Sequence, residues 1–524
     1  MRIFLSGLMG AGKSTVAKAL ATRASLPLFD VDQRISEQAG CSVAELFAAR
    51  GESAFRDLER TTVQGLLAEH PRGVFALGGG AVVAPDVRKL LLGEGTLITL
   101  DASLDELVRR VGHGADRPLL ARVDVRTRLE ELRRERAAAY AECHARVDTT
   151  HLDPERAARA ILEICEEDPI VVPLGERTYR VVIGRGTRHS LARRLRDLGA
   201  VSSVLFVTDS QIGPHWGRAL ASELRSHGHA VSQLEIAPGE QAKTLETVDA
   251  IWQAGLDAGL DRGSVMVGLG GGVVGDLSGF AASTLLRGVR VVHAPTTLLA
   301  MVDSAIGGKT GFDTRHGKNL IGTFHQPSLV LTDVETLSSL PVEERRAGLA
   351  EVVKSAWIDG EASVAQLEAD AQALADGDEA ATVRAIRMAV KLKVRIVCED
   401  EREGGARALL NLGHTLAHAI EASSGYAGIR HGEAVAIGMV AACRVAKKLD
   451  RLEAQDVERA QQLLDRLGLP TAVEPYLGER VLSFLSADKK RKGSKLNYIA
   501  PGRPGQVSIV PMTLDELTQR YKDC

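Results

Sequence analysis

Short runs of apolar residues alternate along the chain with longer stretches in which apolar positions recur at helical spacing. The runs Ile3–Leu5, Val74–Leu77 and Leu97–Leu100 have helical patterns between them, which is typical of a parallel sheet covered by helices. The same rhythm returns further along, at Val204–Thr208, Val265–Leu269, Val291–Ala294 and Leu329–Thr332. From about Val342 the pattern is mainly helical and rich in Ala and Leu, with one late strand-like run at Leu496–Ala500. The pattern therefore predicts two α/β regions followed by a helical lobe.

A domain limit is predicted where the helix-like segment Pro154–Glu167 ends in acidic residues before Pro169. New β-rich runs begin directly afterwards, at Ile170 and Tyr179. At 524 residues the chain also exceeds the usual size of a single core. We predict three domains, covering residues 1–167, 168–340 and 341–524, all of α/β or helical class.

Composition narrows the functional classes. Apolar residues make up 45% and charged residues 25%, the net charge is −3, and no basic block suits nucleic acid or anionic lipid. The six cysteines form no CxxC pair, so neither a disulfide framework nor a thiolate zinc site is indicated. No apolar run reaches a membrane span, and the first residues do not resemble a signal peptide. We expect a cytoplasmic protein that acts on small molecules.

A first glycine motif lies near the start of the chain. Gly7-x4-Gly12-Lys13-Ser14 matches the phosphate-binding loop GxxxxGK[ST], with a predicted strand before it and a predicted helix after it. Glycines let backbone N–H groups converge on phosphate oxygens, Lys13 neutralises the β- and γ-phosphates, and the Ser14 hydroxyl reaches Mg²⁺. The motif predicts a nucleoside triphosphate site.

Polar residues around this loop narrow its substrate. Two carboxylates end a short strand on the same side, one arginine lies in Gly51-Glu-x-x-Phe-Arg-x-x-Glu, and three glycines leave backbone amides bare. Each arginine alone is more typical of a salt-bridging surface residue. Together they predict a pocket for a polyhydroxylated carboxylate beside ATP, formed by Asp30, Asp32, Arg56, Gly78, Gly79, Gly80, Arg117 and Arg136.

These motifs occur in the order found in shikimate kinases, and residues 1–167 resemble that family throughout. The resemblance implies transfer of the ATP γ-phosphoryl group to the 3-hydroxyl of shikimate. It implies catalytic roles for Lys13, Asp32 and Arg117, and Mg²⁺ ligation by Ser14 with Asp30 near the metal. It further implies ATP contacts from Gly10, Ala11, Gly12, Lys13, Ser14, Thr15 and Arg117, and shikimate contacts from Asp32, Arg56, Gly78, Gly79, Gly80 and Arg136. Arg110 is a candidate adenine contact, and Ala137-Ala-Ala-Tyr140 departs from the family in lacking a proline.

A second glycine motif of different design, Gly270-Gly-Gly272-Val-Val-Gly275-Asp276, joins a predicted strand to an apolar helix. Glycines permit close approach of a pyrophosphate, and a helix N-terminus favours its charge, so the motif indicates a dinucleotide site. The spacing is not the strict GxGxxG and is a weak signal alone. A carboxylate, hydroxyls and lysines suited to ribose and phosphate occur nearby, at Glu240, Lys243, Thr296, Thr297, Lys309 and Lys318, although such lysines are also typical of a solvated surface.

Metal-binding residues are predicted in the helical part. His414 and His418 lie four residues apart on one helical face, His431-Gly-Glu433 follows, and Glu351-x-x-Lys354 precedes them. Three N/O ligands with an open fourth position suit catalytic zinc. Spacing alone would make His414 and His418 both ligands, and helix-surface histidines are the alternative.

From about Ile170 to the end the chain resembles 3-dehydroquinate synthases. The motifs that carry the resemblance include PGExxKT, GGGVVGD, MVDSAIGGKTG, GKNLIGTFHQP, AGLAEVVK, LLNLGHTLAHAIE and HGEAVAIG. The resemblance implies zinc (or cobalt) ligation by Glu351, His414 and His431, with His418 left for the substrate phosphate. Implied NAD contacts are Glu240, Lys243, Gly272, Val273, Val274, Gly275, Asp276, Thr296, Thr297, Lys309, Lys318, Thr336, Leu337, Ser338 and Ser339. Implied catalytic or substrate residues are Asp303, Lys309, Asn319, Lys354, Lys393, Arg407, Asn411, His418 and one of Lys489 and Lys490. Arg287 would enter the site of a neighbouring subunit, which implies a homodimer.

The two resemblances together predict a bifunctional enzyme of aromatic precursor synthesis. The second reaction would convert 3-deoxy-arabino-heptulosonate 7-phosphate (DAHP) to 3-dehydroquinate and phosphate, with NAD⁺ regenerated in each cycle. A related sugar-phosphate cyclase or a polyol dehydrogenase is the alternative for the C-terminal part, although Lys393, Arg407 and His418 form an anion grip that a plain dehydrogenase does not need. A regulatory module that binds without turnover is the alternative for the N-terminal part.

Overall fold

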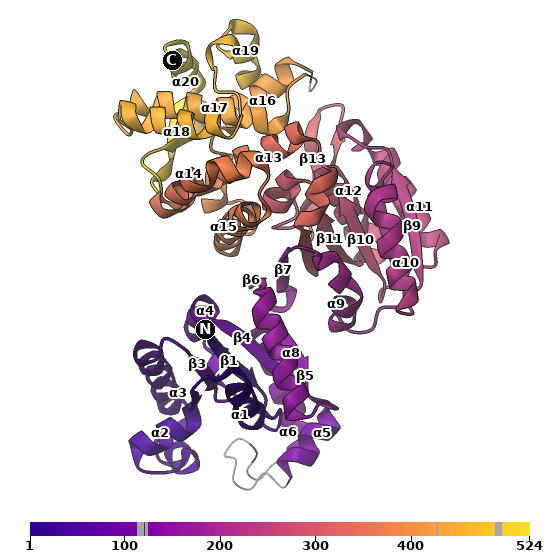
Figure 1. Ribbon diagram of the computed structural model, residues 1–524, viewed down its shortest axis with the longest axis vertical. Coiled ribbons are helices and arrows are strands. Elements are labelled where there is room, and N and C mark those ends of the chain that lie inside the picture. Colours follow the sequence, from indigo (N-terminus) through magenta and orange to yellow (C-terminus); the bar gives the residue numbers. More distant parts are fainter. Residues whose placement is uncertain (113–119, 121–123, 426–427, 488–494) are drawn as a thin grey trace. The chain divides into compact units, whose positions relative to one another are not determined.

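The computed structural model describes residues 1–524 except 113–119, 121–123, 426–427 and 488–494. The chain forms two compact units, Met1–Val182 and Ile183–Cys524 (Figure 1). An antiparallel pair of strands, β6 (Ile170–Val172) and β7 (Tyr179–Gly184), lies at the limit between them. The domain limits at residues 167 and 340 stay predictions.

The first unit is built on a five-stranded parallel sheet. Its strands, in the spatial order β2-β3-β1-β4-β5, are β2 (Leu28–Asp30), β3 (Gly73–Ala76), β1 (Arg2–Gly7), β4 (Thr96–Asp101) and β5 (Ala145–Asp148). The three central strands contain the three predicted apolar runs, because a strand covered on both faces must be apolar throughout. All five carboxyl ends meet at one edge, where ligands bind in open α/β sheets.

Helices complete this unit, and five of them start at a side-chain cap: Asp30, Ser42, Ser103, Asp124 and Asp153 each accept a hydrogen bond from a backbone N–H of the following turn. The helices are α1 (Lys13–Ala24), α2 (Val31–Ala39), α3 (Val43–Glu69), α4 (Pro85–Glu94), α5 (Leu104–Val111), α6 (Val125–Glu135), α7 (Ala137–Ala141) and α8 (Pro154–Glu167).

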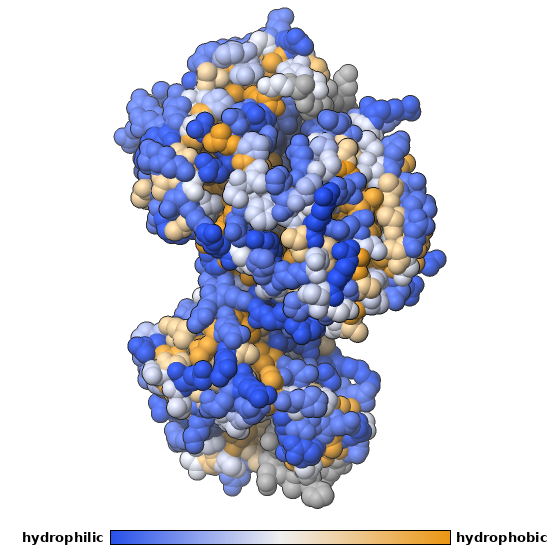
Figure 2. Space-filling view, turned by 45° about the vertical axis from the view of Figure 1, so that its right-hand side comes forward, coloured by the Kyte–Doolittle hydropathy of each residue, from blue (hydrophilic) through white to orange (hydrophobic). Residues whose placement is uncertain are grey.

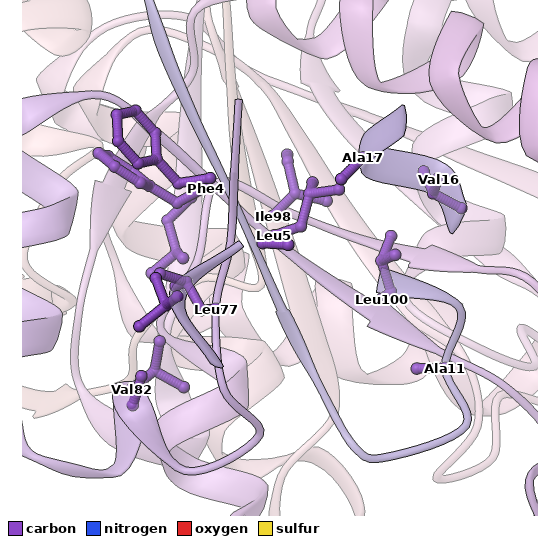
Figure 3. Packing of buried hydrophobic residues seen from close by; sticks show 14 of the residues in the cluster. Phe4, Leu5, Ala11, Val16, Ala17, Leu77, Val82, Ile98 and Leu100 are labelled. Carbon is purple, nitrogen blue, oxygen red and sulfur yellow. The ribbon is translucent and has the colours of Figure 1, made fainter. Parts of the chain in front are cut away.

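The core of the first unit lies around its central strand. Figure 3 shows Leu5 and Ile98 of the sheet beside Ala17 of α1, with Val16 and Leu100 close to the loop that joins β1 to α1. These side chains are buried, and each large one contributes about 1.5–3 kcal/mol. The core therefore holds the end of β1 and the start of α1 in place, and the loop between them carries the first glycine motif.

The second unit contains a parallel sheet of spatial order β14-β11-β10-β8-β9, formed by β8 (Val204–Asp209), β9 (Val231–Ile236), β10 (Val265–Gly270), β11 (Arg290–Pro295) and β14 (Leu329–Asp333). The chain proceeds outward in one direction from β8 to β9, and in the other from β10 to β11 and β14. The order reverses between β8 and β10, so their carboxyl ends flank a topological switch point, the preferred ligand position in such sheets.

The remaining elements of this α/β part are α9 (Leu191–Asp197), α10 (Arg218–Ser226), α11 (Leu245–Asp257), α12 (Gly272–Thr284) and the antiparallel hairpin of β12 (Lys309–Thr314) and β13 (Gly317–Phe324). Helix α12 follows β10 directly and packs on β10 and β11. The second glycine motif thus lies at the start of a buried helix.

The rest of the unit is helical, as predicted. It comprises α13 (Val342–Asp359), α14 (Glu361–Asp376), α15 (Glu379–Glu399), α16 (His414–Ser423), α17 (His431–Lys447), α18 (Ala454–Arg466), α19 (Glu479–Ala487), α20 (Leu514–Lys522) and the hairpin of β15 (Lys495–Pro501) and β16 (Val507–Thr513). Helix α13 is central: it is buried from Ala347 to Ile358 and packs against α14, α15 and α17. Figure 1 shows α14 and α16 to α20 gathered in a lobe beside the α/β part.

The surface is mostly polar. On the face shown in Figure 2 hydrophilic residues predominate, with hydrophobic residues scattered between them. Within the described ranges, no helix combines the length and the apolar character needed to span a bilayer.

Candidate active sites

The first glycine motif forms a loop between β1 and α1. Gly10 (φ 84°) and Gly12 (φ 91°) adopt left-handed conformations that favour glycine, and Gly12 caps the N-terminus of α1. The Lys13 ammonium folds back over the loop and donates to the carbonyl oxygens of Gly7 (2.9 Å) and Leu8 (3.1 Å). Backbone N–H groups, a helix N-terminus and a lysine are thus combined at one point, which is the arrangement that binds phosphates.

The two residues predicted to bind Mg²⁺ lie together. The Ser14 hydroxyl donates to Asp30 Oδ2 at 2.9 Å. Asp30 ends β2 and also caps α2 by accepting from the Gln33 N–H. A hydroxyl and a carboxylate beside a phosphate loop are the oxygen ligands that Mg²⁺ prefers, so the donor set fits this ion.

Arg110, a candidate for adenine from the sequence, lies against the phosphate loop. Its guanidinium donates to the Gly10 carbonyl (3.3 Å), to Thr149 Oγ1 (3.0 Å) and to the Thr149 carbonyl (2.7 Å). The buried Thr149 hydroxyl is also 3.1 Å from the Ala11 carbonyl oxygen. Both residues hold the phosphate loop in place through these hydrogen bonds. The sequence analysis did not identify Thr149, because it belongs to no recognised motif.

The glycines that follow β3 contact the residues predicted to bind shikimate. Arg136 donates to the Gly79 carbonyl at 2.7 Å. A Cβ placed at Gly80 would collide with the Arg56 guanidinium, and one at Gly78 would lie 2.9 Å from Asp32 Oδ1. The structure therefore brings Asp32, Arg56, Gly78, Gly79, Gly80 and Arg136 together, and the glycines are needed for their close approach. Arg117 lies outside the described residues.

Glu59 is a site residue to which the sequence analysis assigned no role. Its side chain is buried, and Oε2 accepts from Arg56 Nη1 at 2.6 Å. Its other oxygen has no hydrogen-bond partner. Burial raises the pKa of Glu59, although the Arg56 guanidinium opposes this. Glu59 holds Arg56 in the pocket, and its position three residues after Arg56 on a helix was the available signal.

The second unit contains a cavity of about 2230 Å³ beyond the carboxyl ends of β8 and β10, between the α/β part and the helical part. Most of the residues predicted for NAD, metal and substrate line it. These are Glu240, Lys243, Gly272, Val273, Val274, Asp276, Thr296, Thr297, Asp303, Lys318, Asn319, Ser339, Asn411, His414, His418 and His431.

The glycine turn presents bare backbone to this cavity. A Cβ at Gly271 would lie 3.1 Å from the Thr297 methyl carbon, and one at Gly272 would lie 3.1 Å from the Ser304 hydroxyl. The nearby Lys243 is buried and forms an ion pair with Asp276 (2.6 Å). Burial alone would lower the pKa of Lys243, but Asp276 and Glu240 outweigh it and raise this pKa, so the lysine stays charged. The glycine turn, the N-terminus of α12 and the Lys243 ammonium together suit the negative charge of a pyrophosphate.

Other predicted NAD residues lie at or behind the same wall. Lys318 pairs with Glu240 at 3.2 Å. Ser339 lines the cavity and accepts from the Trp216 indole N–H at 2.9 Å, whereas Gly275, Thr336, Leu337 and Ser338 do not line it.

The sequence analysis missed Asp209, Ser210 and Gln211, which line the cavity at the end of β8. Asp209 Oδ1 accepts from the backbone N–H groups of Gln211 and Ile212, each at 2.9 Å. These residues lie near the glycine turn only because β8 is the neighbour of β10 across the switch point. The strand order shows this, and the sequence alone does not.

Glu351, His414 and His431 form a compact cluster. Glu351 Oε1 lies 3.5 Å from His414 Nε2 and 3.7 Å from His431 Nε2. One donor atom from each residue lies within 4.8 Å of the others, and no further group of this kind occurs among the described residues. Glu351 Oε1 is buried without a hydrogen-bond partner. Two imidazoles and an unsatisfied carboxylate oxygen fit a zinc or cobalt ion.

Both imidazoles are oriented through their Nδ1 atoms. His414 Nδ1 lies 3.2 Å from the Leu412 carbonyl oxygen, and His431 Nδ1 lies 3.4 Å from Glu421 Oε1. Burial, reinforced by Lys354, lowers the pKa of His414 to about 3, which keeps that ring neutral. Burial also lowers the pKa of His431, but Glu351 and Glu421 outweigh it and raise this pKa to about 10. The carboxylates thus favour a positive charge here, which a divalent cation can supply in place of a proton.

His418 lies beside the cluster without belonging to it. Its ring centroid is 5.4 Å from that of His414 and 6.5 Å from that of His431, and it lines the cavity. The geometry agrees with the ligand set that the family resemblance implied and differs from the set that helical spacing alone would suggest.

Two predicted catalytic lysines are buried behind the cavity wall. Lys354 forms an ion pair with Glu351. Lys393 donates to Asp303 Oδ1 (2.5 Å) and to its carbonyl oxygen (2.6 Å). Although burial opposes it, Lys393 and Lys354 lower the pKa of Asp303 to about 2, so this carboxyl is ionised.

Other predicted substrate residues do not line the cavity. Arg407 is buried and donates to the carbonyl oxygens of Glu401 (2.6 Å) and Gly307 (3.1 Å). Lys309 pairs with Glu403 at 2.5 Å. Arg287 is exposed, with φ at 65°. Lys489 and Lys490 lie outside the described residues.

Comparison with known proteins agrees with this architecture. Residues 9–166 match the shikimate kinase family, residues 233–347 match the N-terminal part of 3-dehydroquinate synthase, and residues 348–491 match its C-terminal part. The chain is 45% identical to a 3-dehydroquinate synthase of Caulobacter vibrioides, over 63% of this chain and 91% of the relative. It is 42% identical to one from Nostoc punctiforme, over 65% of this chain and 94% of the relative.

Among solved structures, a 2-epi-5-epi-valiolone synthase of Streptomyces hygroscopicus with NAD⁺ and Zn²⁺ bound is similar in fold. It is 28% identical, with a TM-score of 0.59 over 66% of this chain and 96% of that one. The fold and the sites define a two-part enzyme, in which a P-loop kinase unit precedes a unit of the class that binds NAD and a metal. The chain belongs to the 3-dehydroquinate synthase family and has a shikimate kinase domain ahead of the synthase.

Proposed function

We propose that the second unit converts DAHP to 3-dehydroquinate and phosphate, and that the first transfers the γ-phosphoryl group of ATP to shikimate. For the synthase, the observation that carries the proposal is the cluster of Glu351, His414 and His431. Its two histidines line the same cavity as Gly271 and Gly272 of the glycine turn. The identity of 45% over nearly the whole length of a synthase favours this reaction over that of a related cyclase.

Residues of the synthase site fall into three groups by position. Glu351, His414 and His431 would hold the metal, and the glycine turn, Lys243 and Asp276 would hold NAD⁺. When bound, the two groups supply a Lewis acid for the substrate alcohol and a reversible acceptor for its electrons. Lys354 and the pair of Lys393 and Asp303 lie next to the metal cluster, where they would fix the substrate's anionic groups and orient it.

Phosphate release from DAHP tests this proposal. Purified protein would be assayed with NAD⁺ before and after chelation, and again after Zn²⁺ or Co²⁺ is added back. The proposal requires release that depends on NAD⁺ and on the metal, without accumulation of NADH. No release from the metal-replete protein would refute it.

In the kinase unit, the loop amides and Lys13 would hold the phosphates of ATP, and Ser14 and Asp30 would hold Mg²⁺. Arg56 and Arg136 are the cations close to the three glycines, so they would bind the shikimate carboxylate, while Asp32 would accept from its hydroxyls. ADP formation with ATP, Mg²⁺ and shikimate should be lost in Lys13→Ala and retained in Lys18→Ala, which removes an exposed lysine of the same helix. Equal activity of the two variants would contradict the proposed role of Lys13.

We also propose that the protein acts as a homodimer. Arg287 is exposed, lies outside its own cavity and has a left-handed backbone conformation next to Leu286 (φ 53°), which suits a residue that is displayed to a partner. If Arg287 completes a neighbouring site, Arg287→Ala mixed with a variant that is inactive through its own metal ligands should recover part of the phosphate release. Sedimentation as a monomer at assay concentrations would disprove the proposal.

A further inference from the structure

Glu421 lies on α16, at the end of the motif LLNLGHTLAHAIE, and the sequence analysis assigned it no role. It lies seven residues after His414, so both side chains project from the same face of this helix. The Glu421 side chain is only 10% exposed and lines the cavity. A carboxylate in such a place requires a partner, because burial of an uncompensated charge is costly.

The partner of Glu421 is the ring of His431, the first residue of α17. Glu421 Oε1 lies 3.4 Å from His431 Nδ1, while the other ring nitrogen lies 3.7 Å from Glu351 Oε1. A carboxylate only accepts hydrogen bonds, so Nδ1 must carry the hydrogen and donate it. When a metal takes the place of the second ring proton, Nε2 is then the free nitrogen, on the side of Glu351 and His414, as a metal ligand needs.

Glu421 also changes the charge balance at the cluster. The one carboxylate among the three clustered residues, Glu351, already forms an ion pair with the buried Lys354. A dication held by Glu351 and two neutral imidazoles beside that lysine would leave a large positive charge in a buried place. Glu421 supplies a second negative charge at hydrogen-bond distance from one of the imidazoles. His414, by contrast, is oriented by the neutral Leu412 carbonyl.

We infer that Glu421 is a positioning residue that orients His431 and strengthens metal binding at the Glu351, His414 and His431 cluster. The inference rests on the proposed metal site. Partners of this kind usually change metal affinity by 10- to 100-fold when they are removed. Glu421 also interacts electrostatically with Lys318, one of the lysines proposed for NAD⁺, but its hydrogen-bond partner is the ring of His431. Its main effect should therefore be on the metal, with a smaller effect on NAD⁺.

The test measures the dissociation constant of Co²⁺ from the metal-free full-length protein, by equilibrium dialysis and by the visible absorption of bound Co²⁺. Glu421→Gln keeps the shape and removes the charge, and Glu421→Leu removes the charge and the acceptor. The matched control is Glu433→Gln, which removes one charge two residues from His431. Glu433 accepts from the Arg430 backbone N–H (2.9 Å) and side chain rather than from the ring.

We expect both Glu421 variants to bind Co²⁺ 10- to 100-fold more weakly than the parent chain, with altered Co²⁺ absorption bands and a dissociation constant for NAD⁺ that changes less than threefold. Glu433→Gln should stay within about threefold of the parent. If Glu421→Gln binds Co²⁺ as tightly as Glu433→Gln does, the inference is wrong while the metal site stands. If the proposed metal site is itself wrong, Glu351→Ala will bind Co²⁺ as tightly as the parent chain does. That result also overturns the inference, and it is distinguishable from the first.

Discussion

The close approach of Arg56 to Gly80 makes a precise prediction for the kinase unit. A Cβ at residue 80 would lie well within 3.0 Å of the Arg56 guanidinium, whereas carbon atoms in contact are about 3.5–4.0 Å apart. Gly80→Ala therefore moves the guanidinium by about 1 Å or more. The backbone of Gly80 (φ −111°) suits alanine, and the displaced atoms end a flexible side chain, so the fold should tolerate the change.

The functional cost should be much larger than the structural one. Displacing a binding group by about 1 Å lowers rates by about 100-fold, which corresponds to about 2.7 kcal/mol of lost transition-state stabilisation. Glu59 should amplify the loss, because Arg56 cannot retreat without weakening its 2.6 Å bond to this buried carboxylate. We expect kcat/KM for shikimate to fall by about 100-fold in Gly80→Ala, with little change in KM for ATP.

ADP formation at varied shikimate concentration measures this effect, and Gly65→Ala is the matched control. Gly65 lies on the exposed side of α3 with no atom within 4 Å of an added Cβ, so its replacement should leave kinetics unchanged and stabilise the helix by up to about 1 kcal/mol. If Gly80→Ala keeps kcat/KM within threefold of Gly65→Ala, Arg56 does not bind the substrate in the position described.

Three further results are expected. Lys243→Met leaves the partly buried Asp276 without its partner and should destabilise the second unit by about 1–3 kcal/mol in urea unfolding, whereas an unchanged midpoint would show that the pair is solvated. Chelation followed by Mg²⁺ addition should abolish phosphate release and spare ADP formation, and equal loss of both activities would contradict separate metal sites. Burial lowers the pKa of His144 from 6.5 to about 4, and its ring accepts from the Leu97 N–H. Between pH 6.5 and 4, His144 therefore carries a proton in the unfolded chain but not in the folded one. The free energy of unfolding should fall by about 1.4 kcal/mol for each unit by which the pH is lowered from 6.5 to 4, and His144→Asn should remove this slope.

Strands with continuous apolar runs could be predicted from the sequence, whereas two edge strands with few buried residues could not. The runs at Val265–Leu269 and Val291–Ala294 form β10 and β11 in the middle of the second sheet, where both faces are covered. By contrast β5 and β9 lie at sheet edges and each buries a single side chain, Val147 and Ile236. One buried residue in a short polar segment leaves no periodic signal.

The hairpin of β12 and β13 was interpreted only as a source of lysines and hydroxyls. Its sequence is rich in Gly, Lys and Thr, and most of β13 is exposed, so neither strand shows the expected alternation. The hairpin packs on the buried helix α12, and this contact is known only from the tertiary structure.

Sites made from one local segment were accessible to sequence reasoning, because the backbone itself forms them. The loop before Lys13 and the turn before Gly272 are of this kind. The metal cluster is different: His414 begins one helix, His431 the next, and Glu351 lies in α13, more than sixty residues earlier. Helical spacing offers His418 in its place, and only the packing of α13 against α17 selects His431.

The electrostatics of the synthase cavity affect how every experiment on its lysines must be read. Among the residues that the structure describes, the buried lysines are Lys243, Lys354 and Lys393, and each forms an ion pair with a carboxylate. Removing the lysine leaves a carboxylate without its partner, which is buried at Glu351 and partly exposed at Asp276 and Asp303. Lost activity in a single lysine variant therefore combines a binding effect with a folding effect. The double variant Lys243→Met with Asp276→Asn separates the two. If it regains stability while its affinity for NAD⁺ stays low, these charged groups act on the cofactor directly. If affinity returns together with stability, the pair serves to hold the turn in place, and the positive charge that meets the pyrophosphate must come from the helix N-terminus.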